Sequence, residues 1–181
     1  MRGRFGIGAL CLTLLSLPAQ AAENLACVTK VVDQKLARNI FKAYRADQNI
    51  GEALMARVGD KVAACSAAND WSEEALESAI RVVLGQILTS GVLGELKPFR
   101  VKPDALRNST DRFLSTLPEE KLRLFVDGEL TGEEGGDIVK QLLGDEVIRL
   151  SQINDKLGSL IGEYAAGRAN ETFFTAQFAR Q

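Results

Sequence analysis

The chain has 181 residues, of which 46% are hydrophobic and 25% are charged, and its formal net charge is −2 at pH 7. This mild acidity argues against nucleic acid as a partner, because phosphate binding needs clustered Lys and Arg. The chain contains no histidine, which excludes Ser-His-Asp and Cys-His catalytic arrangements, the usual zinc sites and Glu-x-x-His di-iron bundles. We therefore expect no metal and no cofactor.

Residues 1–22 have the pattern of a cleaved signal peptide. Arg2 and Arg4 supply a positive start, residues 5–17 form an uncharged, largely apolar run, and Ala19-Gln20-Ala21 offers small residues for cleavage. The run is too short to span a bilayer, which needs about 20 apolar residues; an uncleaved anchor is the alternative. We expect a periplasmic or secreted protein whose mature part, residues 23–181, is one helical domain without an integral membrane segment.

Cys27 and Cys65 are the only thiols left once Cys11 is removed with the signal peptide. In an oxidising compartment two such cysteines are expected to form a structural disulfide. A redox or nucleophilic cysteine is the alternative, but the chain offers neither a Cys-x-x-Cys motif nor a histidine to act as base.

Apolar residues recur at helical spacing over residues 28–45 and again over residues 50–67, with a polar break at 47–49. A short connection makes two such helices antiparallel neighbours. This hairpin brings Cys65, near the end of the second helix, back towards Cys27, so the hairpin and the disulfide support each other.

The stretch from Asp70 to Leu93 is predicted to be the central helix of the fold. Asp70 and Glu73 have the spacing of a capping box, and Trp71 is expected at the first helical position, over the corner with the preceding helix. Apolar residues cover most of the helix surface and leave only a narrow polar strip. The strip consists of Glu74, Ser78, Arg81 and Gly85.

Residues 94–103 are predicted to form an extended crossover, because Pro98 and Pro103 interrupt helical structure. Lys97, Arg100 and Lys102 surround Phe99 in this segment. These basic residues form either a contact patch or, by the simpler interpretation, a solvated connection.

Three further helices are predicted, over residues 104–117, over residues 118–127 and, as one long helix, over residues 137–166. Gly158-x-x-x-Gly162 in the long helix has the spacing of a close helix contact. The fold class that follows is all-α, a single-domain bundle of about five to seven helices with a disulfide-linked N-terminal hairpin.

Phe173, Phe174 and Phe178 concentrate aromatic surface in the last nine residues. They predict either a final helix that packs on the core or an interaction surface for a partner.

The segment from Asp127 has some residues of a calcium loop, but Ile138 stands where a bidentate Glu is required. We see no catalytic residues that form a complete site. The function expected is therefore non-catalytic binding of a protein partner in the cell envelope, in an accessory, inhibitor or chaperone-like role.

Two alternatives remain open. One is a cell-wall enzyme that uses carboxylates, with Glu77 or the segment 129–137 as candidates; Glu77-Ser78 is similar to the catalytic Glu-Ser of lytic transglycosylases, whose Gly-Leu-Met-Gln pattern this chain lacks. The other is a carrier that holds an apolar ligand inside the bundle.

Overall fold

The computed structural model describes residues 24–46, 49–130 and 132–181, and every regular element within these ranges is a helix. The predicted all-α, single-unit fold is thus confirmed, while the predicted signal peptide lies outside the described residues. The helices are α2 (Gln34–Arg45), α3 (Ile50–Ala68), α4 (Glu73–Leu96), α5 (Pro103–Thr116), α6 (Glu119–Asp127), α7 (Gly132–Gly144) and α8 (Asp155–Phe178), with short 3₁₀ helices η1 (Lys97–Phe99) and η2 (Leu150–Gln152).

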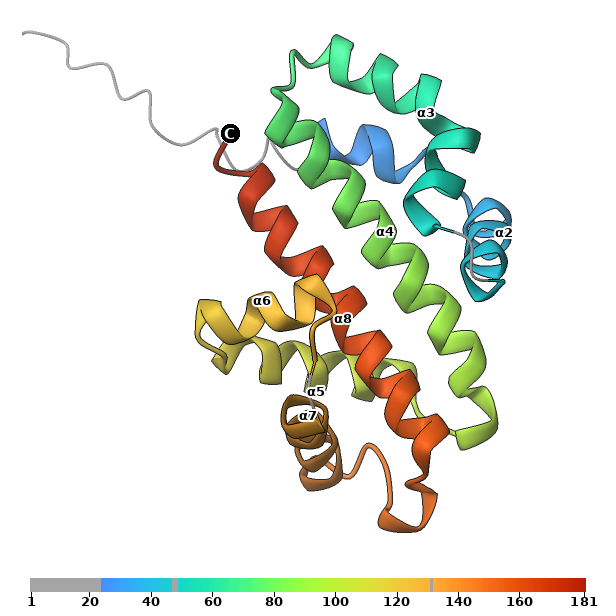
Figure 1. Cartoon of the computed structure of the whole chain (residues 1–181), viewed down its shortest axis with the longest axis vertical. Helices are drawn as coiled ribbons and strands as arrows, with labels where there is room; N and C mark the ends of the chain where they lie inside the picture. The colour runs from blue at the N-terminus through green and yellow to red at the C-terminus, as the bar shows by residue number, and fades with distance from the viewer. Residues whose placement is uncertain (1–23, 47–48, 131) are drawn as a thin grey trace, which may run out of the picture.

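The two longest helices, α4 and α8, lie side by side in opposite directions and form the axis of the molecule (Figure 1). Helices α2 and α3 pack on α4, whereas α5, α6 and α7 gather against α8. The prediction that the helix after Asn69 is the central one is confirmed, but it shares that position with α8.

The backbones of α4 and α8 approach closely where Gly85 faces Gly167. A Cβ atom built on Gly85 would lie 2.6 Å from the Gly167 carbonyl oxygen, so no larger residue fits without a shift. The predicted polar strip was wrong at Gly85, which is buried, and at Ser78, which is 2% exposed. Small residues let a neighbouring helix approach, and the sequence pattern alone did not distinguish that role from solvent exposure.

The Gly158 and Gly162 pair does not mark a close helix contact, contrary to the prediction. A Cβ atom on Gly158 would have nothing within 4 Å, and one on Gly162 would meet only the Leu130 side chain at 3.9 Å. The close helix contact of α8 lies instead at Gly167, beyond the predicted pair.

The N-terminal region begins with a short helical segment at 24–29, followed by a turn and then α2. The predicted continuous helix over residues 28–45 was wrong, because Asp33 caps α2: its Oδ1 accepts the Leu36 backbone N–H at 2.8 Å. The predicted disulfide is confirmed, with a Cα–Cα distance of 5.9 Å between Cys27 and Cys65. It joins the short first segment to α3, while α2 itself packs on α3.

The start of α4 differs from the predicted one by two residues. Ser72, not Asp70, is the N-cap, and its Oγ accepts the Ala75 backbone N–H at 3.1 Å. Asp70 has a φ of +50° and lies in the turn before the helix, so Trp71 also precedes the helix instead of occupying its first position.

Among the described residues, the segment Glu73–Phe99 is long and apolar enough to cross a membrane by length and composition. The core helix of a globular protein has the same composition, and α4 is covered by α8 on one side and by α2 and α3 on another (Figure 1). We therefore describe α4 as a core helix.

The predicted extended crossover at 94–103 is mostly helical. Helix α4 continues to Leu96, η1 holds Pro98 in its first turn, and Pro103 begins α5. Proline is tolerated at these positions because the first turn of a helix needs no N–H donor there. Only residues 100–102 are non-helical, with Arg100 in the left-handed region at a φ of +55°.

The single long helix predicted over residues 137–166 is two helices, α7 and α8. Helix α7 ends in a Schellman motif: the Val147 N–H donates to the Leu142 carbonyl and the Glu146 N–H to the Leu143 carbonyl, with Glu146 at a φ of +55°. Asn154 then caps α8 by accepting the Leu157 N–H at 2.9 Å. The apolar residues between the helices keep helical spacing, so periodicity alone did not reveal the break.

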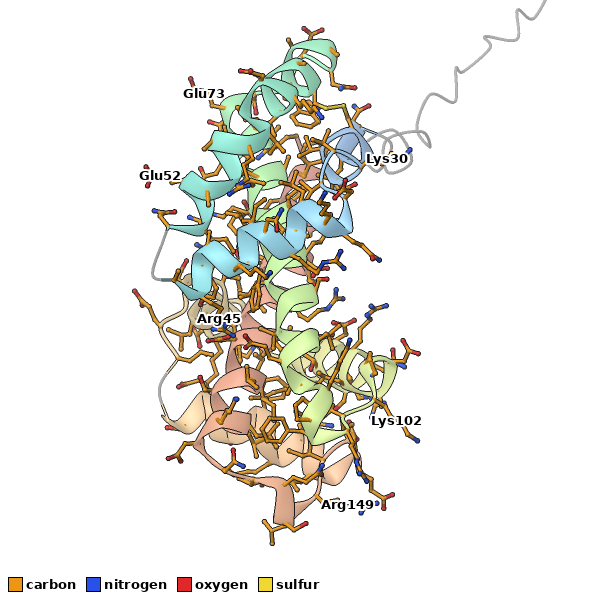
Figure 2. All side chains as sticks on the ribbon, turned by 90° about the vertical axis from the view of Figure 1, so that its right-hand side faces the viewer. Lys30, Arg45, Glu52, Glu73, Lys102 and Arg149 are labelled. Atoms are coloured by element: carbon orange, nitrogen blue, oxygen red, sulfur yellow. A yellow bond between two sulfur atoms is a disulfide. The ribbon has the colours of Figure 1, made fainter. Side chains whose placement is uncertain are left out.

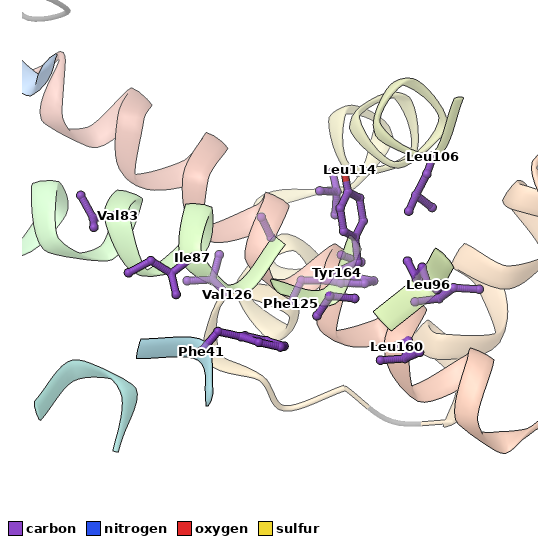
Figure 3. Packing of buried hydrophobic residues seen from close by; sticks show 14 of the residues in the cluster. Phe41, Val83, Ile87, Leu96, Leu106, Leu114, Phe125, Val126, Leu160 and Tyr164 are labelled. Atoms are coloured by element: carbon purple, nitrogen blue, oxygen red, sulfur yellow. The ribbon is translucent and has the colours of Figure 1, made fainter. Parts of the chain in front are cut away.

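One continuous core holds these helices together, with Tyr164 and Phe125 among its largest fully buried side chains (Figure 3). Leu96, Leu106 and Leu160 come from three different helices and reach the same interior. A smaller cluster at the other end of α4 is built around Ala79 and Phe178. The last turns of α8 therefore belong to the fold, and they position the surface described next.

Candidate functional site

Phe173, Phe174 and Phe178, the three phenylalanines proposed as an interaction surface, lie in the last two turns of α8 and have different environments. Phe178 is 6% exposed and packs edge-to-face on Trp71, with ring centroids 5.1 Å apart. It is a core residue. Phe173 and Phe174 are only partly buried and pack edge-to-face on each other at 5.2 Å, so these two rings remain accessible from solvent.

A surface groove of about 260 Å³ opens beside these two rings, between α4, α6 and the end of α8. We call it the aromatic groove. It is lined by Glu74, Glu77, Ser78, Arg123, Val126, Asp127, Phe173, Phe174, Gln177 and Gln181.

Two arginines lie over the faces of the aromatic pair. The Arg123 guanidinium is 5.3 Å from the centroid of Phe173, and that of Arg81 is 5.6 Å from the centroid of Phe174. Both distances are within the range of cation–π attraction. Arg123 also pairs with Glu119 at 3.0 Å, so the groove combines aromatic faces with oriented positive charge.

Three carboxylates, those of Glu74, Glu77 and Asp127, line the same groove. Glu74 lies in the first turn of α4, where its own backbone N–H and the Ser72 hydroxyl hold the pKa of its carboxyl below the ordinary value. It therefore stays ionised and is unsuited to donating a proton. Glu77, the candidate of the enzyme alternative, is 67% exposed and lies 3.8 Å from Arg81.

The other acidic candidate, the segment 129–137, is not a free loop. Most of it forms the first turns of α7, and Asp137 pairs with Lys140 at 2.8 Å, which lowers the pKa of the Asp137 carboxyl. Among the described residues, no three carboxylate or cysteine side chains are grouped so that they could hold a metal ion.

A polar cluster that the sequence analysis missed lies where α4, α5 and α8 meet. Glu171 accepts a hydrogen bond from the Thr89 hydroxyl at 2.8 Å and forms an ion pair with Arg168 at 2.5 Å. The Arg168 guanidinium also donates two hydrogen bonds to the Asp111 carboxylate, at 2.8 and 2.9 Å. Burial raises the pKa of Glu171, against the opposing effects of Arg168 and the Thr89 hydroxyl. None of these four residues lines the aromatic groove, so the cluster joins three helices and does not form part of that site.

Two smaller grooves, of about 150 and 160 Å³, lie near Tyr44 and near Val32. Sites for drug-sized ligands usually enclose about 300–1,000 Å³. Both grooves are well below that range, and the aromatic groove lies just below it.

Comparison with protein-family models, curated proteins and solved structures found no match to this chain.

Proposed function

We propose that this chain is an exported envelope protein that binds a protein partner through the aromatic groove, without catalysing a reaction. The observation that carries the proposal is the accessible Phe173–Phe174 pair with Arg81 and Arg123 over its faces. Aromatic and arginine side chains are enriched in protein interfaces, and hot-spot residues are often of these types. The Cys27–Cys65 disulfide is consistent with the oxidising compartment that export implies.

The groove is well suited to a short protruding element of a partner. Its lining combines the apolar side chains of Val126 and the two rings with charged side chains of both signs. A buried apolar centre with a polar rim is the general anatomy of a specific interface. We therefore expect a partner that inserts an apolar or basic side chain between α4 and α6.

The test uses the mature chain, residues 23–181, as bait in cross-linking to envelope extract, followed by a binding measurement with each purified candidate. Arg123→Glu reverses a charge on the groove rim at an exposed position, and Phe174→Ser removes an aromatic face. We expect each change to weaken binding of a true partner at least about tenfold, the effect of a modest interface hot spot.

Met55→Ser is the matched control, because Met55 is an exposed apolar residue on α3, away from the groove. Circular dichroism and thermal unfolding check that Phe174→Ser still folds. A partner that binds both groove variants as tightly as the unchanged chain would contradict the proposal.

The carboxylates of the groove support a second candidate, a cell-wall enzyme in which Glu77 takes part. This candidate predicts turnover of peptidoglycan fragments by the purified chain and its loss in Glu77→Gln. Absence of turnover over a range of pH would eliminate it.

A further inference from the structure

The turn between α4 and α5 and the turn between α7 and α8 meet at one end of the molecule. The Gln152 side-chain amide donates a hydrogen bond to the Phe99 carbonyl oxygen at 2.5 Å and joins the two turns. Figure 2 shows Lys102 and Arg149, one from each turn, at this same end. We define the tip surface as the exposed basic and large apolar residues of these two turns and of the adjoining helix start: Lys97, Arg100, Lys102, Arg149, Leu150, Ile153 and Lys156.

The tip surface exposes large apolar side chains that the core does not use. Leu150 is 76% exposed and Ile153 is 39% exposed; Met55 on α3, at 42%, is the other large hydrophobic residue of the described chain that is exposed. A leucine exposed to this degree projects into solvent, and the tip residues line none of the three grooves described above.

The outward position of Leu150 is built into the turn. The Arg149 backbone N–H donates to the Gln152 side-chain oxygen at 2.7 Å, and the Gln152 backbone N–H donates to the Arg149 carbonyl at 2.9 Å. Together with the bond to Phe99, these contacts fix η2 on the rest of the fold, so Leu150 is held outward by a well-bonded turn.

The same surface is basic although the chain as a whole is acidic. Lys97, Arg100, Lys102, Arg149 and Lys156 are all exposed, and within the described residues none of them takes part in an ion pair. The acids of the two turns and of the helix starts that follow them are fewer: Asp104, Asp145, Glu146 and Asp155, of which Asp145 is already paired with Arg112. Asp104 and Asp155 lie in the first turns of α5 and α8, where the helix dipoles offset part of their charge.

We propose that the tip surface docks on a membrane that carries anionic phospholipid. Leu150 and Ile153 insert at the boundary between headgroups and acyl chains, while the surrounding Lys and Arg side chains contact lipid phosphates. Peripheral proteins bind membranes through this combination of projecting apolar side chains and basic residues. The charge complementarity favours lipid phosphate over neutral lipid, and the projecting leucine favours an insertable surface over a folded acidic protein.

The test is co-sedimentation of the mature chain with vesicles of phosphatidylcholine, with and without phosphatidylglycerol. We expect binding to the phosphatidylglycerol vesicles that weakens as salt is added, because salt screens surface charge, and much weaker binding to neutral vesicles. The double variant Leu150→Ser/Ile153→Ser should bind about tenfold less or weaker still, as loss of buried apolar area implies. Arg149→Gln/Lys102→Gln should lower binding to the anionic vesicles only.

Met55→Ser and Lys61→Gln are the matched controls, since both residues are exposed on α3 and outside the tip surface; they should bind as the unchanged chain does. A second measurement follows insertion directly. Tryptophan fluorescence of Leu150→Trp should shift to shorter wavelength with phosphatidylglycerol vesicles, whereas that of Met55→Trp should not.

Failure of the unchanged chain to bind anionic vesicles would overturn the proposal and leave an acidic protein as the occupant of the tip surface. Binding that survives Leu150→Ser/Ile153→Ser undiminished would overturn it as well, since simple electrostatic attraction would then explain the result. Because these measurements use lipid alone, they are independent of whether the aromatic groove has a protein partner.

Discussion

The contact between Gly85 and Gly167 limits the size of the residue that each position can hold between α4 and α8. A methyl group on Gly85 would meet backbone atoms of α8, which cannot move aside as a flexible side chain can. Gly158, in the same helix as Gly167, has open space around it. The two positions therefore respond oppositely to the same substitution.

We expect Gly85→Ala to lower the free energy of unfolding by up to about 2 kcal/mol, since a steric cost of roughly 1–3 kcal/mol opposes a gain in helix propensity of about 1 kcal/mol. Gly158→Ala should instead raise it by about 0.5–1 kcal/mol. Urea denaturation of both variants measures the difference. Equal effects at the two sites would contradict the close approach of α4 and α8.

Glu171 is a second residue whose environment has a measurable consequence. Its folded-state pKa is raised by burial, so the folded chain holds the proton more tightly than the unfolded chain does. Stability associated with this residue is fully present below the unfolded pKa, about 4.5, and is lost as the pH rises through the raised folded pKa.

We therefore expect the unchanged chain to lose stability relative to Glu171→Gln as the pH rises from about 4.5 towards neutrality. Denaturation curves of both proteins at several pH values provide the comparison. Carboxyl groups with a lowered pKa, such as that of Asp137, change the stability at lower pH. Both proteins contain them, so they do not affect the comparison. A relative loss of stability on acidification through this range would show that the ionised Glu171 is net stabilising.

At the scale of elements, the boundary between α7 and α8 is decided by one residue in an uncommon conformation. Glu146 lies in the left-handed region at a φ of +55°, where glycine is the preferred residue. Residues 145–149 would instead be helical interior if α7 and α8 were continuous, as the apolar spacing suggested.

Glu146→Gly distinguishes the two arrangements. In the Schellman motif it should raise the free energy of unfolding by about 1 kcal/mol, because it relieves the cost of a left-handed non-glycine residue. In a continuous helix it would lower stability by about 1 kcal/mol. Thermal or urea denaturation gives the sign directly.

At the scale of the whole molecule, the Cys27–Cys65 bond attaches the first helical segment to α3 and closes a loop of 38 residues. The neighbouring Val28 is fully buried, so the bond also keeps the start of the described chain in the core. Loop closure at this separation corresponds to about 4 kcal/mol in the chain-entropy model.

Cys27→Ser/Cys65→Ser should therefore unfold at a clearly lower denaturant concentration, with a loss of roughly 2–4 kcal/mol. Reduction of the unchanged chain should produce the same shift, and reoxidation should reverse it. Thiol titration of the folded, air-oxidised chain should find no free sulfhydryl at these two positions. An unchanged denaturation midpoint on reduction would contradict this role.

The sequence by itself determined the helical class, the hairpin with its disulfide and the central apolar helix. The helices depend on periodicity over a few turns, and the disulfide on the two cysteines outside the predicted signal peptide. The end of α6 was predicted from local information as well, and Gly128 there has a φ of +73°, the left-handed region that favours glycine.

Only the tertiary structure decided which glycines touch another backbone, where the predicted long helix breaks, and which phenylalanines stay accessible. Gly85 and Gly158 look alike in sequence, and their difference arises from the position of a second helix in space. The Thr89–Glu171–Arg168–Asp111 cluster and the tip surface join segments far apart in the chain. Packing brings such residues together, and helical periodicity carries no information about distances between helices.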